Sequence, residues 1–224
     1  HTEADAASLI HHVPGRDQVL SSYRLLGVVT TNYDILAERA LRHRPTGRPA
    51  RPGFYYGGLP RPQFARGLAE PFTVHRRNTE VELVGEVPLF KLHGSLNWAR
   101  GNDGSIEIFQ DLRLAFRHGG SAAIVPPITE KDCPPWLKNI WRAATACLKA
   151  SEVWIVVGFS LPAYDQAIFD MFRESGESVS KVVIVDPSAA SIKERWATVA
   201  PNAKVETRTE GLPRRVPALT PPPP

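Results

Sequence analysis

The sequence of 224 residues is poor in cysteine, and this scarcity excludes one common kind of metal site. Its two cysteines, Cys133 and Cys147, form no CxxC pair and cannot supply the four thiolates of a cysteine-type zinc site. We therefore expect no zinc and no other metal centre. Low cysteine use is also typical of the reducing cytoplasm, which is the compartment we expect for this protein.

Long apolar runs are missing too. The longest, Val153–Phe159, has the length of a β-strand, whereas a helix needs about 18 apolar residues to cross a bilayer. No secretory signal is visible, and because the chain opens at His1 without a Met we expect it to be trimmed or processed. The content of 42% hydrophobic and 22% charged residues indicates a folded globular protein with no membrane partner.

Acidic residues are nearly missing from Arg39–Arg77, which holds nine arginines and one glutamate, Glu70. This segment carries +8, and since the whole chain carries +4, the remainder carries −4. A single basic stretch is not a protein-wide basic surface, so nucleic acid is not an expected partner. We predict an Arg/Pro-rich surface insertion at residues 42–80, with Phe54–Tyr56 outside the core, and a Pro-rich tail at residues 212–224. The alternative to a solvated insertion is that this segment binds an anionic ligand.

Alternating strand and helix patterns predict the fold class. Glu152–Val157 and Lys181–Val185 are continuous β-branched runs, typical of buried parallel strands, and Trp136–Lys149 and Tyr164–Arg173 have helical spacing. The other predicted elements are strands at Leu25–Thr31, Val81–Val84, Leu89–Leu92, Ile106–Phe109, Ala122–Val125 and Lys204–Thr207, and helices at Thr2–His12, Arg16–Arg24, Asp34–Leu41 and Ser188–Val199. This order predicts one α/β domain over residues 1–224, a Rossmann-like parallel sheet with helices on both faces.

Polar side chains follow the first strands of this sheet. Asn32 and Asp34 come after one strand and His93 after another, so an amide, a carboxylate and an imidazole share one crevice. We expect neither Asn32 nor His93 to belong to the core, because each lies just past its strand. The simpler alternatives are that Asn32 or Asp34 only caps the following helix and that His93 only completes a turn.

A second polar group follows the later strands. Gly158 and Ser160 would let a phosphate approach a strand-to-helix turn, and Asp186 is suited to a ribose diol. The alternatives are an ordinary turn at Gly158–Ser160 and a helix cap at Asp186.

Four motifs, in this order, resemble the SIR2-like domains of prokaryotes: Thr30-Thr31-Asn32-Tyr33-Asp34, Lys91-Leu92-His93-Gly94-Ser95-Leu96-Asn97-Trp98, Gly158-Phe159-Ser160-Leu161 and Lys181–Asp186. These domains are relatives of sirtuins, and many are NAD hydrolases in anti-phage defence. The resemblance runs from about Leu25 to Asp186. It implies a Rossmann-like NAD site and cleavage of the bond between nicotinamide and ribose, with NAD or an ADP-ribose-type ligand as the partner. A homo-oligomer or a fused effector or sensor domain is the further partner that it implies.

The resemblance also implies a role for each site residue. Asn32 and His93 are the implied catalytic residues, acting at the nicotinamide ribose, and Asp34 lies near the nicotinamide. The implied NAD-binding residues are Thr30, Thr31, Asp34, Gly158, Ser160, Leu161 and Asp186, of which Gly158, Ser160 and Asp186 hold the phosphates and the adenosine ribose.

Two departures from the family pattern affect the expected activity. Sirtuin deacylases carry a four-cysteine zinc module after the His motif, and its lack here favours NAD cleavage over deacylation. The family also begins with a strand and a glycine-rich loop that clasps the pyrophosphate, whereas the only glycine before Gly27 is Gly15. A module that senses NAD or ADP-ribose without turnover is therefore the alternative to a hydrolase, and a deacylase is the third reading.

Overall fold

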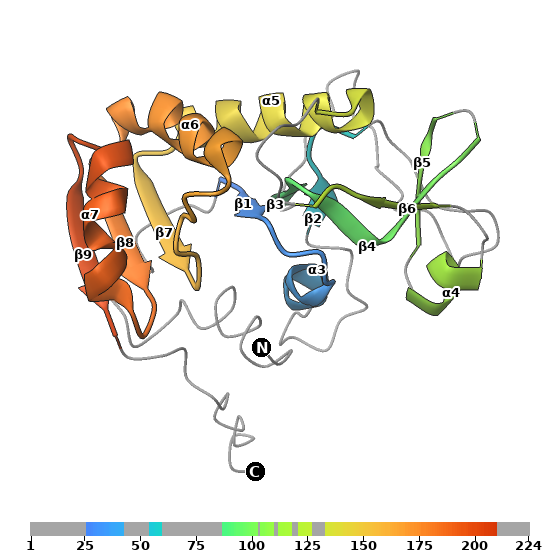
Figure 1. Cartoon of the computed structure of the whole chain (residues 1–224), viewed down its shortest axis with the longest axis horizontal. Helices are drawn as coiled ribbons and strands as arrows, with labels where there is room; N and C mark the ends of the chain where they lie inside the picture. The colour runs from blue at the N-terminus through green and yellow to red at the C-terminus, as the bar shows by residue number, and fades with distance from the viewer. Residues whose placement is uncertain are drawn as a thin grey trace, which may run out of the picture.

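The computed structural model describes residues 26–42, 54–59, 87–102, 104–109, 112–117, 121–126 and 133–209. These residues form a mixed α/β fold with two parallel sheets, one antiparallel sheet and helices (Figure 1). Outside them lie the predicted helices at Thr2–His12 and Arg16–Arg24, the predicted strand at Val81–Val84, most of the insertion at residues 42–80 and the tail at residues 212–224. No helix in the described part of the chain is long and apolar enough to span a membrane.

The central sheet is parallel and has the strand order β1-β3-β2. It consists of β1 (Val28–Thr30), β3 (Val87–Lys91) and β2 (Phe54–Tyr56). Helix α3 (Leu36–Arg42) follows β1, and helix α5 (Pro135–Lys149) crosses above this sheet in Figure 1. In the register, Thr30 lies opposite Lys91, so the loops that carry Asn32 and His93 leave the sheet at the same edge.

The prediction that Phe54–Tyr56 lies outside the core is wrong. The segment is strand β2, with Phe54 only 2% exposed, and the Phe54 and Tyr56 rings pack edge to face at 5.4 Å. Flanking prolines and glycines are typical of a loop, but aromatic residues suit a pleated, half-buried surface. A strand of three residues is too short to show a periodicity of its own, so only its pairing with β3 reveals it.

The second sheet is antiparallel and was not part of the predicted architecture. It has the order β5-β4-β6, from β4 (Gly94–Arg100), β5 (Ile106–Ile108) and β6 (Ser121–Ile124), with α4 (Leu112–Arg117) between the last two. The sequence predicts strands near β5 and β6, but it predicts none at residues 94–98, which follow the predicted strand Leu89–Leu92. They belong to β4, so only Leu92 and His93 separate β3 from β4.

The third sheet confirms the predicted strand–helix–strand units. Its strands run parallel in the order β7-β8-β9. Its elements are β7 (Val153–Val157), α6 (Gln166–Ser175), the 3-10 turn η1 (Gly176–Ser178), β8 (Lys181–Val185), α7 (Ala189–Val199) and β9 (Lys204–Arg208). Trp154, Phe172 and Trp196 pack between this sheet and its helices, with ring centroids 5.1–6.4 Å apart. One continuous core joins these residues to the central sheet.

Candidate functional site

Thr30 ends β1, and the loop that follows, before α3, holds Thr31, Asn32, Tyr33 and Asp34. The backbone N–H of Asn32 donates to Thr30 Oγ1 at 3.1 Å, and the Asn32 side chain is exposed. Asp34 Oδ1 accepts a hydrogen bond from the N–H of Leu36 at 3.0 Å, which caps the first turn of α3. Asp34, and not Asn32, is therefore the residue that satisfies the start of this helix.

His93 is held at the end of β3 by backbone hydrogen bonds on both sides. The N–H of Leu92 donates to the Thr30 carbonyl at 3.0 Å, and the carbonyl of His93 accepts from Val125 N–H at 2.9 Å. The next residue must be glycine, because Gly94 has a φ of +80° and a Cβ there would lie 1.9 Å from the Ala123 carbonyl oxygen. The Gly of the Leu-His-Gly sequence thus sets the direction in which the chain leaves His93.

The imidazole of His93 contacts a buried carboxylate. Its Nε2 lies 3.0 Å from Asp165 Oδ2, and the two side chains are only 3% and 4% exposed. The other oxygen of Asp165 accepts from Ile168 N–H at 3.4 Å, at the N-cap of α6. Since a carboxylate accepts a hydrogen bond, the neutral imidazole carries its proton on Nε2, so Asp165 fixes both the tautomer and the ring orientation.

Tyr33 forms one wall of this site. Its ring centroid lies 6.1 Å from that of His93, and its hydroxyl donates to the Val125 carbonyl at 3.2 Å. Burial, together with the negative charge of Asp165, raises the pKa of the Tyr33 phenol. Tyr33 therefore contributes a neutral aromatic face beside the imidazole.

A second set of site residues lies at the ends of β7 and β8. Val157 and Val185 are opposite each other in the register, so Gly158 and Asp186 follow adjacent strand ends. Gly158 has a φ of +58°, and Asp186 Oδ1 accepts from Ser188 N–H at 2.6 Å before α7. Asp186 thus makes the cap-like turn that was one of the two readings of its sequence.

An arginine adds positive charge to this second set. Arg195, on α7, reaches the carbonyl of Ser160 with Nη1 at 3.5 Å, the outer limit of a hydrogen bond. Both residues are exposed. A guanidinium beside a glycine-containing turn is an arrangement that suits a phosphate.

Leu161 has an unusual backbone for a branched residue. Its φ is +52°, the left-handed region, and its side chain is 1% exposed within the core. Any contact of Leu161 with NAD would therefore involve its backbone, because its side chain packs inside the protein.

Glycine is expected to be tolerated better than alanine at position 161. Both Leu161→Gly and Leu161→Ala lose the buried side chain, but only alanine keeps a Cβ that clashes at positive φ, at a cost of roughly 1–2 kcal/mol. Urea denaturation should show the glycine variant to be more stable by about 1 kcal/mol, the reverse of the usual order. An alanine variant that is the more stable of the two would contradict the left-handed backbone.

The contact between His93 and Asp165 joins the two sets of residues. Asp165 lies four positions after Leu161, on the connection from β7 to α6, whereas His93 ends β3 of the central sheet. The structure therefore brings Asn32, His93 and the β7–α6 connection to one region. His93 is more buried than expected, at 2% exposed, because Trp141, Val125 and the Asp165 connection surround the β3–β4 turn.

Sequence reasoning missed Asp165, Tyr33 and Arg195 as site residues. Asp165 precedes a helix, and a helix-cap pattern gives no hint that its second oxygen reaches a histidine 72 positions away. Tyr33 belongs to the motif of residues 30–34, in which the polar side chains, and not the aromatic one, predict a ligand site. Arg195 is one of several charged residues on an amphipathic helix, and only the placement of α7 beside Ser160 distinguishes it.

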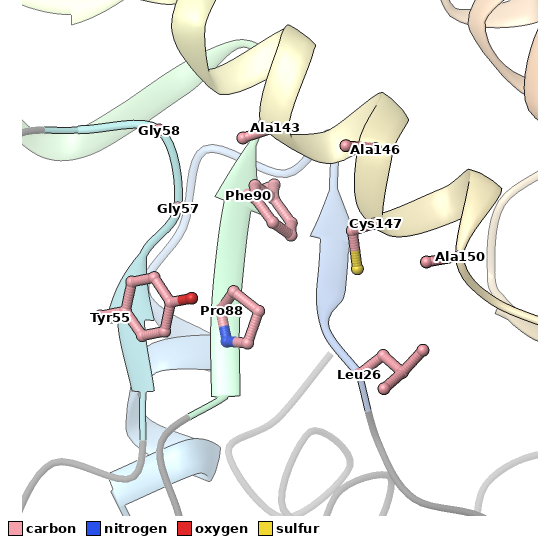
Figure 2. Close-up of a pocket in the computed structure, with 10 residues that line it drawn as sticks. All are labelled: Leu26, Tyr55, Gly57, Gly58, Pro88, Phe90, Ala143, Ala146, Cys147 and Ala150. Carbon is pink, nitrogen blue, oxygen red and sulfur yellow. The ribbon is translucent and has the colours of Figure 1, made fainter. Parts of the chain in front are cut away.

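The chain also has an open apolar pocket of about 400 Å³, drawn in Figure 2. It lies between α5 and the central sheet and includes Phe90, Pro88 and Cys147. None of the site residues named above lines it, and burial raises the pKa of the Cys147 thiol, so the group stays protonated. An apolar pocket of this kind offers nothing to a dinucleotide phosphate.

Neither protein-family models nor the curated proteins gave a match to this chain. Within the described ranges, no group of three or more His, Cys, Asp or Glu side chains could hold a metal ion.

Proposed function

We propose that this chain is the NAD-cleaving unit of a SIR2-like NAD hydrolase, and that its two parallel sheets are the halves of a Rossmann-like NAD site. The observation that carries the proposal is the buried His93–Asp165 pair beside the Asn32 loop. Ligands of open parallel sheets lie beyond the carboxyl ends of the strands. Asn32 and His93 follow β1 and β3 at such ends, and Gly158 and Asp186 follow β7 and β8. The sequence motifs support NAD as the ligand.

In the proposed complex the two sets of residues bind opposite ends of NAD. The turn at Gly158–Ser160, with Arg195 beside it, takes the pyrophosphate, and Asp186 takes the adenosine ribose. Asn32, Asp34 and His93 then face the nicotinamide ribose. Thr30, at the end of β1, and Thr31 lead directly into Asn32 and would lie beside the same ribose.

The proposed reaction is a hydrolysis at C1′ of the nicotinamide ribose. The C1′–N1 bond breaks, nicotinamide leaves with the electron pair, and the oxygen of a water molecule bonds to C1′ and loses a proton. Nicotinamide in NAD is a cationic pyridinium and leaves without strong protonation. The protein must orient the ribose, stabilise an oxocarbenium-like transition state and position the water.

The His93–Asp165 pair suits this task. An imidazole can take the proton of the water, or of a ribose hydroxyl, near neutral pH. The Asp165 carboxylate would stabilise the imidazolium that results, and its place at the N-cap of α6 keeps it fixed. The exposed amide of Asn32 can bind the water or the ribose oxygens without adding charge.

A sensor that binds NAD or an ADP-ribose derivative without turnover is the second candidate function. The burial of His93 favours it, since an imidazole that is 2% exposed is poorly placed to meet water before a ligand arrives. Incubation of the protein with NAD separates the two candidates, because only a hydrolase releases nicotinamide. An acyl-lysine peptide in the same assay tests for a deacylase.

Replacement of Asn32 by alanine is expected to lower nicotinamide release by about 10²–10³-fold, the usual effect of removing one oriented hydrogen-bond donor. Stability should change by less than about 0.5 kcal/mol, because Asn32 is exposed and Asp34 caps α3. Chromatographic measurement of nicotinamide, together with a thermal melt, checks both expectations.

Asn139→Ala is the matched control, because Asn139 is an exposed asparagine on α5 and is not one of the site residues named above. It should release nicotinamide at the normal rate. Equal rates for the Asn32 variant and this control would remove Asn32 from the catalytic machinery.

A further inference from the structure

A group of buried polar side chains lies beneath the β1–α3 loop, and the site described above does not use it. We call it the polar ring; it consists of Glu38, Tyr56, Lys91, Ser95 and Asn97. All five side chains are buried, with Lys91 and Ser95 at 0% exposed and Tyr56 the most exposed at 8%. They come from α3, β2, β3 and β4, so the ring joins the helix to three strands in two sheets.

The ring begins at the carbonyl of Asp34. The ammonium of Lys91 donates a hydrogen bond to this carbonyl and forms an ion pair with Glu38 at 3.2 Å between Nζ and Oε1. The hydroxyl of Tyr56 donates to the same carboxylate oxygen at 3.0 Å. Burial and the negative charge of Glu38 raise the pKa of Tyr56 well above its usual value, so the phenol stays a donor.

The ring ends at the carbonyl of the preceding residue, Tyr33. Asn97 donates from Nδ2 to the Tyr56 hydroxyl at 3.1 Å and accepts at Oδ1 from Ser95 Oγ at 2.7 Å. Ser95 Oγ is also 3.2 Å from the Tyr33 carbonyl, which the N–H of Leu96 holds at 2.9 Å. Two successive carbonyls of the β1–α3 loop, those of Tyr33 and Asp34, thus accept hydrogen bonds from strands β4 and β3.

The composition of the ring is poorly explained by stability alone. A buried ion pair is often no better for stability than apolar side chains of the same size, because both charges lose their water. Within the described part of the chain, the second oxygen of Glu38, Oε2, has no hydrogen-bond partner although it is buried. A core optimised only for stability would not leave such an atom unsatisfied.

We infer that the polar ring is a positioning device that holds the β1–α3 loop, and with it Asn32, in a fixed place relative to His93. Lys91 is central to it, because this residue is two positions before His93 and contacts the loop directly through Asp34. The importance of this placement for catalysis rests on the proposed function, whereas the restraint on the loop does not. The members of the ring are positioning residues and touch no reacting atom.

The test removes both charges of the ring at once. The double variant Lys91→Met with Glu38→Gln leaves no unpaired charge in the core but deprives the Asp34 carbonyl of its donor. Hydrogen exchange of the full-length protein, read on a peptide that spans residues 31–37, should become at least about tenfold faster. Peptides from β7 and β8 should keep their normal exchange, and kcat for nicotinamide release should fall at least about tenfold.

Lys181→Met with Glu206→Gln is the matched control. Lys181 Nζ and Glu206 Oε2 form an ion pair at 2.9 Å on the third sheet, away from the loop. Its removal should leave both the exchange of residues 31–37 and nicotinamide release unchanged. The inference would be overturned if residues 31–37 exchanged at the same rate in the double Lys91/Glu38 variant as in the wild-type protein.

A milder variant covers the case in which the double variant does not fold. Tyr56→Phe keeps the aromatic ring but removes the hydroxyl that links Glu38 to Asn97. It should speed up the loop exchange in the same direction and by a smaller factor, and unchanged exchange would again overturn the inference. If the wild-type protein releases no nicotinamide while the loop exchange responds as expected, the proposed function fails and the positioning device stands.

Discussion

Replacement of His93 by glutamine is expected to lower nicotinamide release by about 10²–10⁴-fold, the usual effect of losing a general acid–base group. Glutamine can still donate a hydrogen bond to Asp165, so the buried carboxylate keeps a partner and the fold is retained. The measurement is nicotinamide release at saturating NAD. Normal release from a folded variant would show that His93 is not the catalytic base.

Alanine at position 93 is a less informative choice. Because His93 lies just past its strand, the sequence predicts that it does not belong to the core, but its side chain is 2% exposed and pairs with Asp165. Its removal leaves a buried carboxylate without its hydrogen-bond donor, which costs about 1–3 kcal/mol. Loss of activity in this variant would therefore mix chemistry with unfolding.

Asp165→Asn removes the negative charge beside His93 but keeps a side chain that can cap α6. Asparagine is as good a helix N-cap as aspartate, so α6 should keep its start and the melting temperature should stay near that of the wild type. The imidazole loses the carboxylate that fixes its tautomer, so release should again fall. The losses in the double variant with His93→Gln should not add, because the two residues act as one unit.

Replacement of Lys91 alone by methionine is expected to destabilise the protein by about 3–5 kcal/mol at pH 7. The substitution leaves the carboxylate of Glu38 buried without its cation, and among the described residues only the Tyr56 hydroxyl still donates to it. Urea denaturation measures the loss. The double variant with Glu38→Gln should recover most of it, because no uncompensated charge then lies in the core.

A second lysine provides the comparison for this effect. Lys181 forms an ion pair with Glu206 in which the two side chains are 20% and 30% exposed. Lys181→Met should cost no more than about 1 kcal/mol, as for exposed pairs. If Lys91→Met were as mild as Lys181→Met, the burial of the Lys91–Glu38 pair would be in doubt.

The parts of the fold that sequence predicted well are those with long local patterns. Strands β7 and β8 are uninterrupted β-branched runs, and their observed bounds, Val153–Val157 and Lys181–Val185, differ from the predicted ones by at most one residue. Helix α5 has a clear apolar stripe and begins one residue before its predicted start. Such patterns identify an element from its own residues, because burial on both faces of a sheet or on one face of a helix determines the residue types.

The parts that sequence missed depend on contacts between distant segments. Strand β2 is three residues between prolines and glycines, and its place in the core comes from pairing with β3, 33 positions along the chain from Phe54 to Val87. The polar ring cannot be predicted from the sequence for the same reason. Lys91 reads as the polar end of a strand, and nothing local shows that Glu38 and Asp34 meet its ammonium.

In the candidate site, Asn32 and His93 follow two neighbouring strands, and Gly158 and Asp186 follow two others. The registers of Thr30 with Lys91 and of Val157 with Val185 confirm that each pair of loops leaves its sheet together. The contact between His93 and Asp165 could not be predicted in this way, because it joins two different sheets through a side chain on a connection.

The most direct test of the proposed function is the fate of NAD incubated with the full-length protein. Nicotinamide and the ribosyl product are quantified over time, and the experiment is repeated with His93→Gln. The proposed function predicts many molecules of nicotinamide released per protein molecule, with release lowered by at least about 10² in the variant. Intact NAD recovered after stoichiometric binding, with no nicotinamide at any time, would contradict a hydrolase and leave the sensor.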